Sequence, residues 1–177
     1  MNTNKFLNMI KNELIDILDT NKNINYDDFI HYFDKEKRIF ICAAGRSSMA
    51  ARGFVNRLVH LGFNAHLVGE ISSPKARKND LLIIISNSGN TSSLNAIAER
   101  ARKDGVKILN ITSNRNSKIY NISDYSIIIE GADKTNQPMG TLFEQFALLL
   151  VDSIVLCLMD IYLEDSDSMR IRHSNLE

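Results

Sequence analysis

The amino-acid sequence predicts an α/β fold, a three-layer sandwich around a central five-stranded parallel sheet, with additional helices at the N-terminus. Three observations lead to this prediction. Leu81–Ile85 is a run of five aliphatic residues, which is typical of a strand buried on both faces of a parallel sheet. From Arg38 onward, strand-like runs alternate with segments of helical spacing, and glycines follow several of the helical segments. Such βαβ units place helices on both faces of one sheet.

We expect a single-domain protein whose main part covers residues 38–177. The first 37 residues are expected to form a helical segment that packs on the core of this main part. Apolar residues recur at three- and four-residue steps between Phe6 and Leu18, which predicts an amphipathic helix that ends in the polar run Asp19–Asn25. A second, short helix is expected over Tyr26–Asp34. No chemistry is expected from either helix.

The remaining elements follow in chain order. Arg38–Ala44 predicts the first strand, and the polar turn Gly45–Ser48 leads from it into a helix that Gly62 ends. The later strands of the predicted sheet are Asn64–Val68, Leu81–Ile85, Val106–Ile111 and Tyr125–Ile129. The later helical segments are Ser92–Lys103, one or two turns within Ser117–Ile122, and a long helix over Thr141–Leu163. The tail Arg170–Glu177 contains no helix breaker.

A loop rich in hydroxyl groups joins the central strand to the next helix. Its candidate ligand groups are those of Ser86, Asn87, Ser88 and Thr91. A helix N-terminus offers unpaired N–H groups and a partial positive charge, and hydroxyl groups add hydrogen-bond donors around them. The alternative is an ordinary capped loop, because Ser, Thr and Asn are common N-caps. The loop carries more hydroxyl groups than one cap needs, so we expect it to bind a phosphate group.

A second corner of the same kind follows the first strand, where Gly45, Arg46 and Ser47 again join a strand to a helix. Two such corners at the carboxyl ends of neighbouring parallel strands face one crevice, which is where open α/β sheets bind ligands. Arg46 has no evident core role and is expected to clamp a phosphate group or a sugar hydroxyl. The alternative for Arg46 is a surface arginine that pairs with a nearby carboxylate.

The bulk composition argues against several other classes of protein. Lysine plus arginine and aspartate plus glutamate balance at 21 each, so neither nucleic acid nor an anionic membrane is an expected partner. Cys42 and Cys157 lie in apolar runs, far from any CxxC or Cys/His ligand spacing, which predicts buried free thiols in a reducing cytoplasm and no metal site. The N-terminus has no signal-peptide core. We therefore expect a cytoplasmic protein.

The long helix Thr141–Leu163 is apolar around nearly its whole circumference. A membrane span is the first alternative, but Glu144, Asp152 and Asp160 interrupt the run, and charged residues near the centre of a bilayer are expensive. A helix that is apolar all round in a soluble protein is buried, so we expect it to serve both the core and a subunit interface. Glu144 in its first turn suits the helix dipole and would also face whatever enters from the preceding loop.

Six separated motifs carry a resemblance to a known family. In chain order they are Gly45–Ser47, Arg57–Phe63, Gly69–Glu70 with Pro74, Ser86–Thr91, Pro138–Gln145 and Arg172–Glu177. On these motifs the chain resembles the sugar isomerase (SIS) domain family and, within it, the 6-phospho-3-hexuloisomerases, from about residue 38 to residue 177. Three positions depart from glycines that are common in the family: Ala43, Ser48 and Asn87.

The resemblance implies a flavodoxin-like SIS fold and a homo-oligomer, a tetramer or a dimer. It also implies interconversion of D-arabino-3-hexulose 6-phosphate and D-fructose 6-phosphate, in carbohydrate metabolism such as the ribulose monophosphate pathway. Moving the carbonyl between C3 and C2 through a cis-enediolate needs a base, a polarising donor and a phosphate anchor, but no cofactor. The acid–base candidates at matched positions are Glu144, His173 and His60, and we favour Glu144 as the base.

Two other functions stay open on the sequence. One is another phosphosugar isomerase, acting on arabinose 5-phosphate or on a heptose phosphate. The other is a non-catalytic sugar-phosphate-binding SIS module of the kind found in transcriptional regulators. That second alternative predicts an attached DNA-binding domain, whereas the first 37 residues show no basic recognition face.

Overall fold

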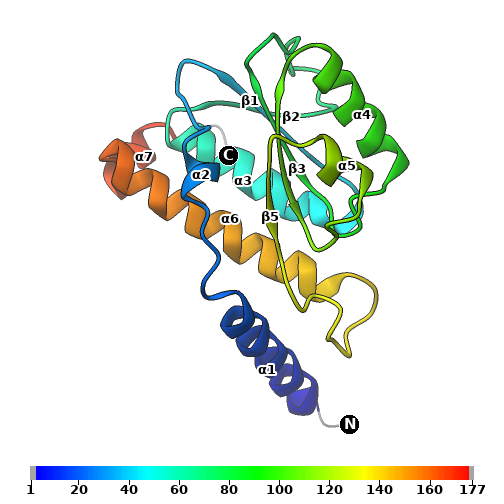
Figure 1. Ribbon diagram of the computed structural model, residues 1–177. Helices are drawn as coiled ribbons and strands as arrows, with labels where there is room; N and C mark the ends of the chain where they lie inside the picture. The colour runs from blue at the N-terminus through cyan, green and yellow to red at the C-terminus, as the bar shows by residue number, and fades with distance from the viewer. Residues whose placement is uncertain (1–2, 176–177) are drawn as a thin grey trace.

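The computed structural model describes residues 3–175, which form one parallel sheet of five strands with helices on both faces (Figure 1). The strands are β1 (Arg38–Ala43), β2 (Asn64–Leu67), β3 (Leu81–Ile85), β4 (Lys107–Thr112) and β5 (Tyr125–Ile128). They lie in the order β2-β1-β3-β4-β5, and every adjacent pair is parallel. The predicted fold class is therefore confirmed, and this strand order places the topological switch point between β1 and β3.

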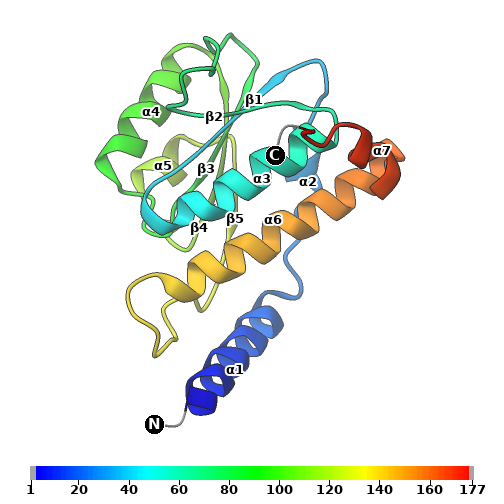
Figure 2. The same cartoon turned by 180° about the vertical axis from the view of Figure 1, so that it is seen from behind.

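Two helical layers cover the sheet. One face carries α3 (Ser48–His60) and α6 (Thr141–Tyr162), and the other carries α4 (Ser92–Lys103) and α5 (Lys118–Ile122) (Figures 1 and 2). The central strand β3 supplies both cores: Leu81, Ile83 and Ile85 join the larger core under α3 and α6, while Leu82 and Ile84 join the smaller core under α4. Burial on both faces explains why all five positions of β3 are aliphatic.

The N-terminal segment forms α1 (Thr3–Asn21) and α2 (Asp27–Ile30). α1 packs along α6 and projects from the body of the molecule, whereas α2 packs against β5 (Figure 1). The expectation of a helix over Tyr26–Asp34 was wrong in length, because only four residues are α-helical. Beyond Ile30 the chain continues in tighter turns, in which the N–H of Phe33 donates to the carbonyl of Ile30 at 3.0 Å.

A short helix that the sequence did not predict, α7 (Ser166–Ile171), follows α6. Leu163 ends α6 in the left-handed conformation, with φ at 52°. Asp165 then caps α7 through its carboxylate, which accepts from the backbone N–H groups of Asp167 and Ser168, and the hydroxyl of Ser168 closes a capping box. The cap turns the chain back toward the amino end of the sheet.

Among the described helices, α6 alone is long and apolar enough to cross a membrane by length and composition. Half of its most apolar stretch is buried within this single chain, where it packs along α3 and α1. It therefore occupies the position of a core helix. Its outer side leaves Leu148, Leu149, Leu156 and Ile161 between 41% and 62% exposed.

Candidate active site

Two polar loops leave the sheet side by side at its topological switch point. Ala43 of β1 pairs in register with Ile85 of β3, so the residues that follow each strand start at the same level of the sheet. The first loop passes through the short 3₁₀ helix Gly45–Ser47 into α3, and the second, Ser86–Thr91, enters α4. The structure thus brings the two predicted corners together, as expected for the carboxyl ends of adjacent parallel strands.

The first corner presents an exposed arginine on a tight turn. Gly45 adopts a left-handed conformation with φ at +59°, and open space surrounds the position where a Cβ would stand. The hydroxyl of Ser48 braces the turn by donating to the carbonyl of Gly45 at 2.6 Å. Ser47 is buried and precedes α3, but its side chain makes no capping hydrogen bond. The Arg46 side chain stays 61% exposed.

The second corner is held by its own backbone and by α5. Ser86 Oγ accepts from the N–H of Gly89 at 3.2 Å. Gly89 has φ at +59°, and a Cβ there would lie 2.2 Å from Ser117 Oγ, so this position requires glycine. Ser88 is exposed, and its hydroxyl accepts from the N–H of Asn90 at 3.3 Å. Thr91 is the N-cap of α4, yet its side chain makes no capping hydrogen bond.

Sequence reasoning missed a third polar segment, at the end of β4, that braces the second corner. Thr112 Oγ1 and Ser113 Oγ donate to the carbonyl of Asn87 at 3.0 and 3.1 Å, and Ser113 Oγ also contacts Asn87 Oδ1. Asn114 Nδ2 donates to the carbonyl of Ser88 at 3.0 Å. The signal was available, because a run of hydroxyl and amide side chains follows β4 just as it follows β3.

Glu144 in the first turn of α6 faces the first corner. Its Oε2 atom lies 2.9 Å from Arg46 Nε, and its side chain is only 16% exposed. The two groups are close without being aligned, so this buried oxygen has no hydrogen-bond partner among the described residues. Gly140, just before α6, packs against Asn87, since a Cβ on Gly140 would lie 3.0 Å from Asn87 Nδ2. Arg46 does pair with a carboxylate, as its alternative interpretation held, and that carboxylate is the predicted base.

The two candidate histidines lie together, but away from Glu144. The rings of His60 and His173 stack with centroids 4.9 Å apart, and Arg172 Nη1 donates to the carbonyl of His60 at 2.8 Å. His60 ends the 13-residue helix α3, which starts at the first corner and spans about 20 Å. Figure 2 shows α3 and α6 running side by side toward α7. Within one chain, the histidines therefore lie near the amino end of the sheet.

A second glutamate, Glu164, follows the other end of α6. Lys35 Nζ donates to its Oε1 at 2.7 Å, Arg172 binds both carboxylate oxygens at 2.9 and 3.0 Å, and Ser168 Oγ donates at 2.6 Å. These donors, with Arg172 first, lower the pKa of Glu164 to about 2. Its side chain is 8% exposed, so the cluster ties α6, α7 and the turn after α2 into one network.

Other candidate chemistry is sparse in the described part of the chain. Residues 3–175 contain no group of three or more His, Cys, Asp and Glu side chains that could hold a metal ion. Burial raises the pKa of the Cys42 thiol to about 12, so this cysteine stays protonated at neutral pH. An apolar cavity of about 390 Å³ lies beside α4, lined by side chains such as Phe40, Leu82 and Ile97. The two polar corners do not line it.

Comparisons with known proteins identify the family and the fold. The SIS domain family model matches residues 32–152. The 3-hexulose-6-phosphate isomerase of Bacillus subtilis is 38% identical, and the similarity covers 100% of both chains. The protein of the same name from Methylomonas aminofaciens is 34% identical over 98% of this chain and 99% of its own. A crystal structure from Methanococcus jannaschii, inferred to be a 3-hexulose-6-phosphate isomerase, is 32% identical, has a TM-score of 0.84 and covers 98% of this chain and 99% of its own.

Proposed function

The chain belongs to the SIS domain family and is an isomerase, and we propose that it interconverts D-arabino-3-hexulose 6-phosphate and D-fructose 6-phosphate in the cytoplasm. The observation that carries the proposal is the pairing of Arg46 with Glu144 beside two hydroxyl-rich loops at the switch point of the sheet. A cation, a carboxylate with a free oxygen and a phosphate cradle are the groups that this isomerisation requires. Full-length similarity to two proteins named 3-hexulose-6-phosphate isomerase supports this choice of sugar.

The phosphate group of the substrate is proposed to bind between the two corners, at Gly45–Ser47 and at Ser86–Thr91. Helices of 13 and 12 residues, α3 and α4, start at these corners and point their N-terminal N–H groups at the crevice. The alternative of an ordinary capped loop is weakened, because neither Ser47 nor Thr91 uses its side chain as a cap. Neither hydroxyl forms a capping hydrogen bond within residues 3–175, and both are proposed to donate to phosphate oxygens.

Glu144 is proposed as the base. In the direction of fructose 6-phosphate, its carboxylate removes the proton from C2 of the 3-hexulose, and the electron pair moves to the C3 oxygen as the cis-enediolate forms. The proton then returns to C3, while the O2 proton is transferred to O3 and leaves the carbonyl at C2. No atom is gained or lost. An Oε2 atom without a hydrogen-bond donor is suited to accept this proton.

Arg46 is proposed to link phosphate binding to this step. Its side chain is mostly exposed, and within residues 3–175 the ion pair with Glu144 is its one side-chain contact to a charged group. A phosphate dianion offers a guanidinium more charge and better hydrogen-bond geometry than this misaligned carboxylate does. When the substrate arrives, Arg46 turns toward the phosphate and Glu144 is left facing the sugar.

We further propose that a second copy of the chain supplies the remaining acid–base group, with His173 favoured over His60. In one chain both rings lie near the opposite end of α3 from Glu144, so a contribution to this crevice requires a neighbour. The exposed area of 10381 Å² exceeds the roughly 8,700 Å² usual for a folded monomer of 20.0 kDa. Apolar side chains on the outside of α1 and α6 contribute to the excess, which supports a homo-oligomer.

An isomerase assay on a panel of phosphosugars tests the function. We expect kcat/KM for D-arabino-3-hexulose 6-phosphate to exceed that for arabinose 5-phosphate and for a heptose 7-phosphate by at least about 100-fold, because catalysis selects the position of the carbonyl. A higher value for either competitor would reassign the substrate. Binding of these sugars by calorimetry without any turnover would instead identify a non-catalytic module.

A further inference from the structure

The N-terminal helix α1 is attached to the rest of the molecule mainly by polar groups. Its described residues bury only Glu13, Ile17 and Asn21, and two of these three are polar. Both polar side chains contact the segment 130–137, which leads from the end of β5 to the start of α6. A helix that served only to cover a core would bury an apolar stripe at these positions.

The Glu13 carboxylate is saturated by donors from this segment. It accepts from Thr135 Oγ1 at 2.6 Å, from the N–H of Asn136 at 2.8 Å, and from the side-chain amides of Gln137 and Asn136 at 3.0 and 3.1 Å. The hydrogen bond from Thr135 is the largest cause that lowers the pKa of Glu13 to about 2. The carboxylate is therefore ionised at neutral pH and holds three consecutive residues of the loop.

At the end of α1, its last residue, Asn21, holds the beginning of the same segment. Its Nδ2 donates to the carbonyl of Glu130 at 2.9 Å, and its Oδ1 accepts from the N–H of Glu130 at 2.9 Å. Both hydrogen bonds go to the backbone, so they fix the chain whatever side chain stands at position 130. α1 thus holds both ends of the segment, through Asn21 at residue 130 and through Glu13 at residues 135–137.

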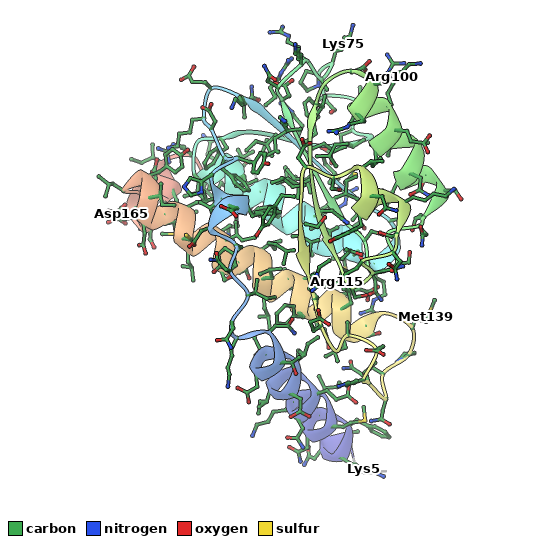
Figure 3. All side chains as sticks on the ribbon, in the orientation of Figure 1. Lys5, Lys75, Arg100, Arg115, Met139 and Asp165 are labelled. Carbon is green, nitrogen blue, oxygen red and sulfur yellow. The ribbon has the colours of Figure 1, made fainter. Side chains whose placement is uncertain are left out.

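A chain of contacts leads from this segment to the helical turn that carries Glu144. The side-chain amides of Gln137 and Gln145 exchange two hydrogen bonds, each 3.1 Å long, and Gln145 is the neighbour of Glu144 in the first turn of α6. Figure 3 shows exposed Met139 on the loop between them, directed away from the body of the molecule. Gly140, which ends the loop, packs against Asn87 of the second corner.

We propose that Glu13 is a positioning residue for the isomerase reaction: it fixes segment 135–137 and, through Gln137 and Gln145, the first turn of α6 that carries Glu144. The proposal rests on the function proposed above, in which Glu144 is the base. α1 then belongs to the catalytic unit although none of its side chains touches the crevice. A misplacement of the base by about 1 Å is enough to lower kcat by about 100-fold.

Glu13→Gln is the sharpest variant, because all four partners of Glu13 are donors and an isosteric amide places an NH₂ group against at least one of them. The matched control is Asp16→Asn, which removes the same charge from an exposed position of the same helix. Gln137→Ala is the second variant. It cuts the link to Gln145 and leaves the hydrogen bonds of Glu13 to Thr135 and Asn136, so α1 stays docked.

The first measurement does not depend on activity. Hydrogen exchange of the backbone amides of residues 135–145 is expected to speed up at least about 10-fold in Glu13→Gln and by a smaller factor in Gln137→Ala, with α4 and the Asp16→Asn protein unchanged. Unchanged amide hydrogen exchange over residues 135–145 in both variants would overturn the proposal that Glu13 fixes this segment. The exchange result does not depend on whether the wild-type protein isomerises a phosphosugar. A failure of the proposed function can therefore be told apart from a failure of this proposal.

The second measurement separates positioning from a merely structural role. At a temperature well below unfolding, we expect kcat of Glu13→Gln to fall by 10- to 100-fold while KM changes by less than about threefold, since the phosphate corners are untouched. The kcat of Gln137→Ala should also fall, and the kcat of Asp16→Asn should match that of the wild type. A lower urea midpoint with unchanged kcat in the folded variants would show that Glu13 only stabilises the protein, and would overturn its positioning role.

Discussion

The two ends of α6 carry two glutamates with opposite surroundings. Glu164, just past the C-terminal end, accepts hydrogen bonds from Lys35, Arg172 and Ser168 on both of its oxygens. Glu144, in the N-terminal first turn, has one ion-pair contact, with an arginine that is 61% exposed, and no aligned donor on its buried Oε2. Both carboxylates are largely buried, so burial alone does not distinguish them.

The difference lies in the number of donors, and it separates a structural carboxylate from a reactive one. Donors that favour the charged form lower the pKa of Glu164 to about 2 and make it a poor proton acceptor. A carboxylate with an unoccupied lone pair beside a mobile cation can still take a proton from a substrate.

The largest effect is expected from Glu144→Gln. The amide keeps the size of the side chain but cannot accept the C2 proton, so we expect kcat to fall by at least about 10³-fold with KM nearly unchanged. Steady-state kinetics at pH 7 measure it, with Glu164→Gln as the matched control, expected within about threefold of the wild-type kcat while folded. Equal losses of kcat in the two variants would remove the distinction between the two ends of α6.

The next effect concerns the histidine pair beside Glu164. His173→Ala should lower kcat by about 10²- to 10⁴-fold if the ring reaches a neighbour's crevice as an acid–base group. Deletion of residues 170–177 is a poorer test, because it also removes Arg172 and two hydrogen bonds of Glu164. Mixing unfolded Glu144→Gln and His173→Ala chains and refolding them together should restore part of the activity, since some sites then combine two intact residues. No recovery in mixed oligomers would contradict a shared site.

A smaller effect is expected on stability. The pKa of Glu164 is lowered from 4.5 to about 2 by folding, so its stabilising contribution is present above pH 4.5 and is lost as the pH falls toward 2. We expect Glu164→Gln to lose about 2 kcal/mol of unfolding free energy at pH 7, allowing for the partial exposure of Arg172. Urea unfolding at pH 7 and pH 3 should show this difference shrinking at the lower pH. A constant difference would mean that the ion cluster is not its source.

The smallest effect is expected from Ser88→Ala combined with Thr91→Ala. If these hydroxyls bind the phosphate equally in the ground and transition states, KM should rise by about 10-fold or more and kcat should change little. Ser93→Ala, an exposed hydroxyl within α4, is the matched control. An unchanged KM in the double variant would place the phosphate elsewhere.

Helices and strands with a clear hydrophobic periodicity were predicted from the sequence. Short elements that depend on a single contact were missed. α4 was predicted with its observed bounds, Ser92–Lys103, because its hydroxyl-rich start and glycine exit are local signals. α7 is only six residues long with one buried side chain, Met169, so it has no periodicity to detect. Its cap, Asp165 with Ser168, was the signal that could have revealed it.

The candidate site was predictable where it depends on strand order, and not where it depends on distant contacts. Parallel strands bring their carboxyl ends to one edge, so the two corners could be joined from the sequence. The stacking of His60 on His173 and the grip of Glu13 on the loop before α6 join segments far apart in the chain. Glu13 did leave a trace, since it interrupts the inward stripe of α1 between Ile10 and Ile17.

The two glycines that open the corners set different limits on how this protein can change under selection. Both are left-handed, but Gly45 is surrounded by open space, so an asparagine there meets only a modest backbone cost. Any side chain at Gly89 would collide with Ser117, which is fully buried and caps α5 with the same hydroxyl. A library for altered sugar preference can therefore include asparagine at Gly45, whereas lineages that mutate Gly89 must first rebuild the start of α5.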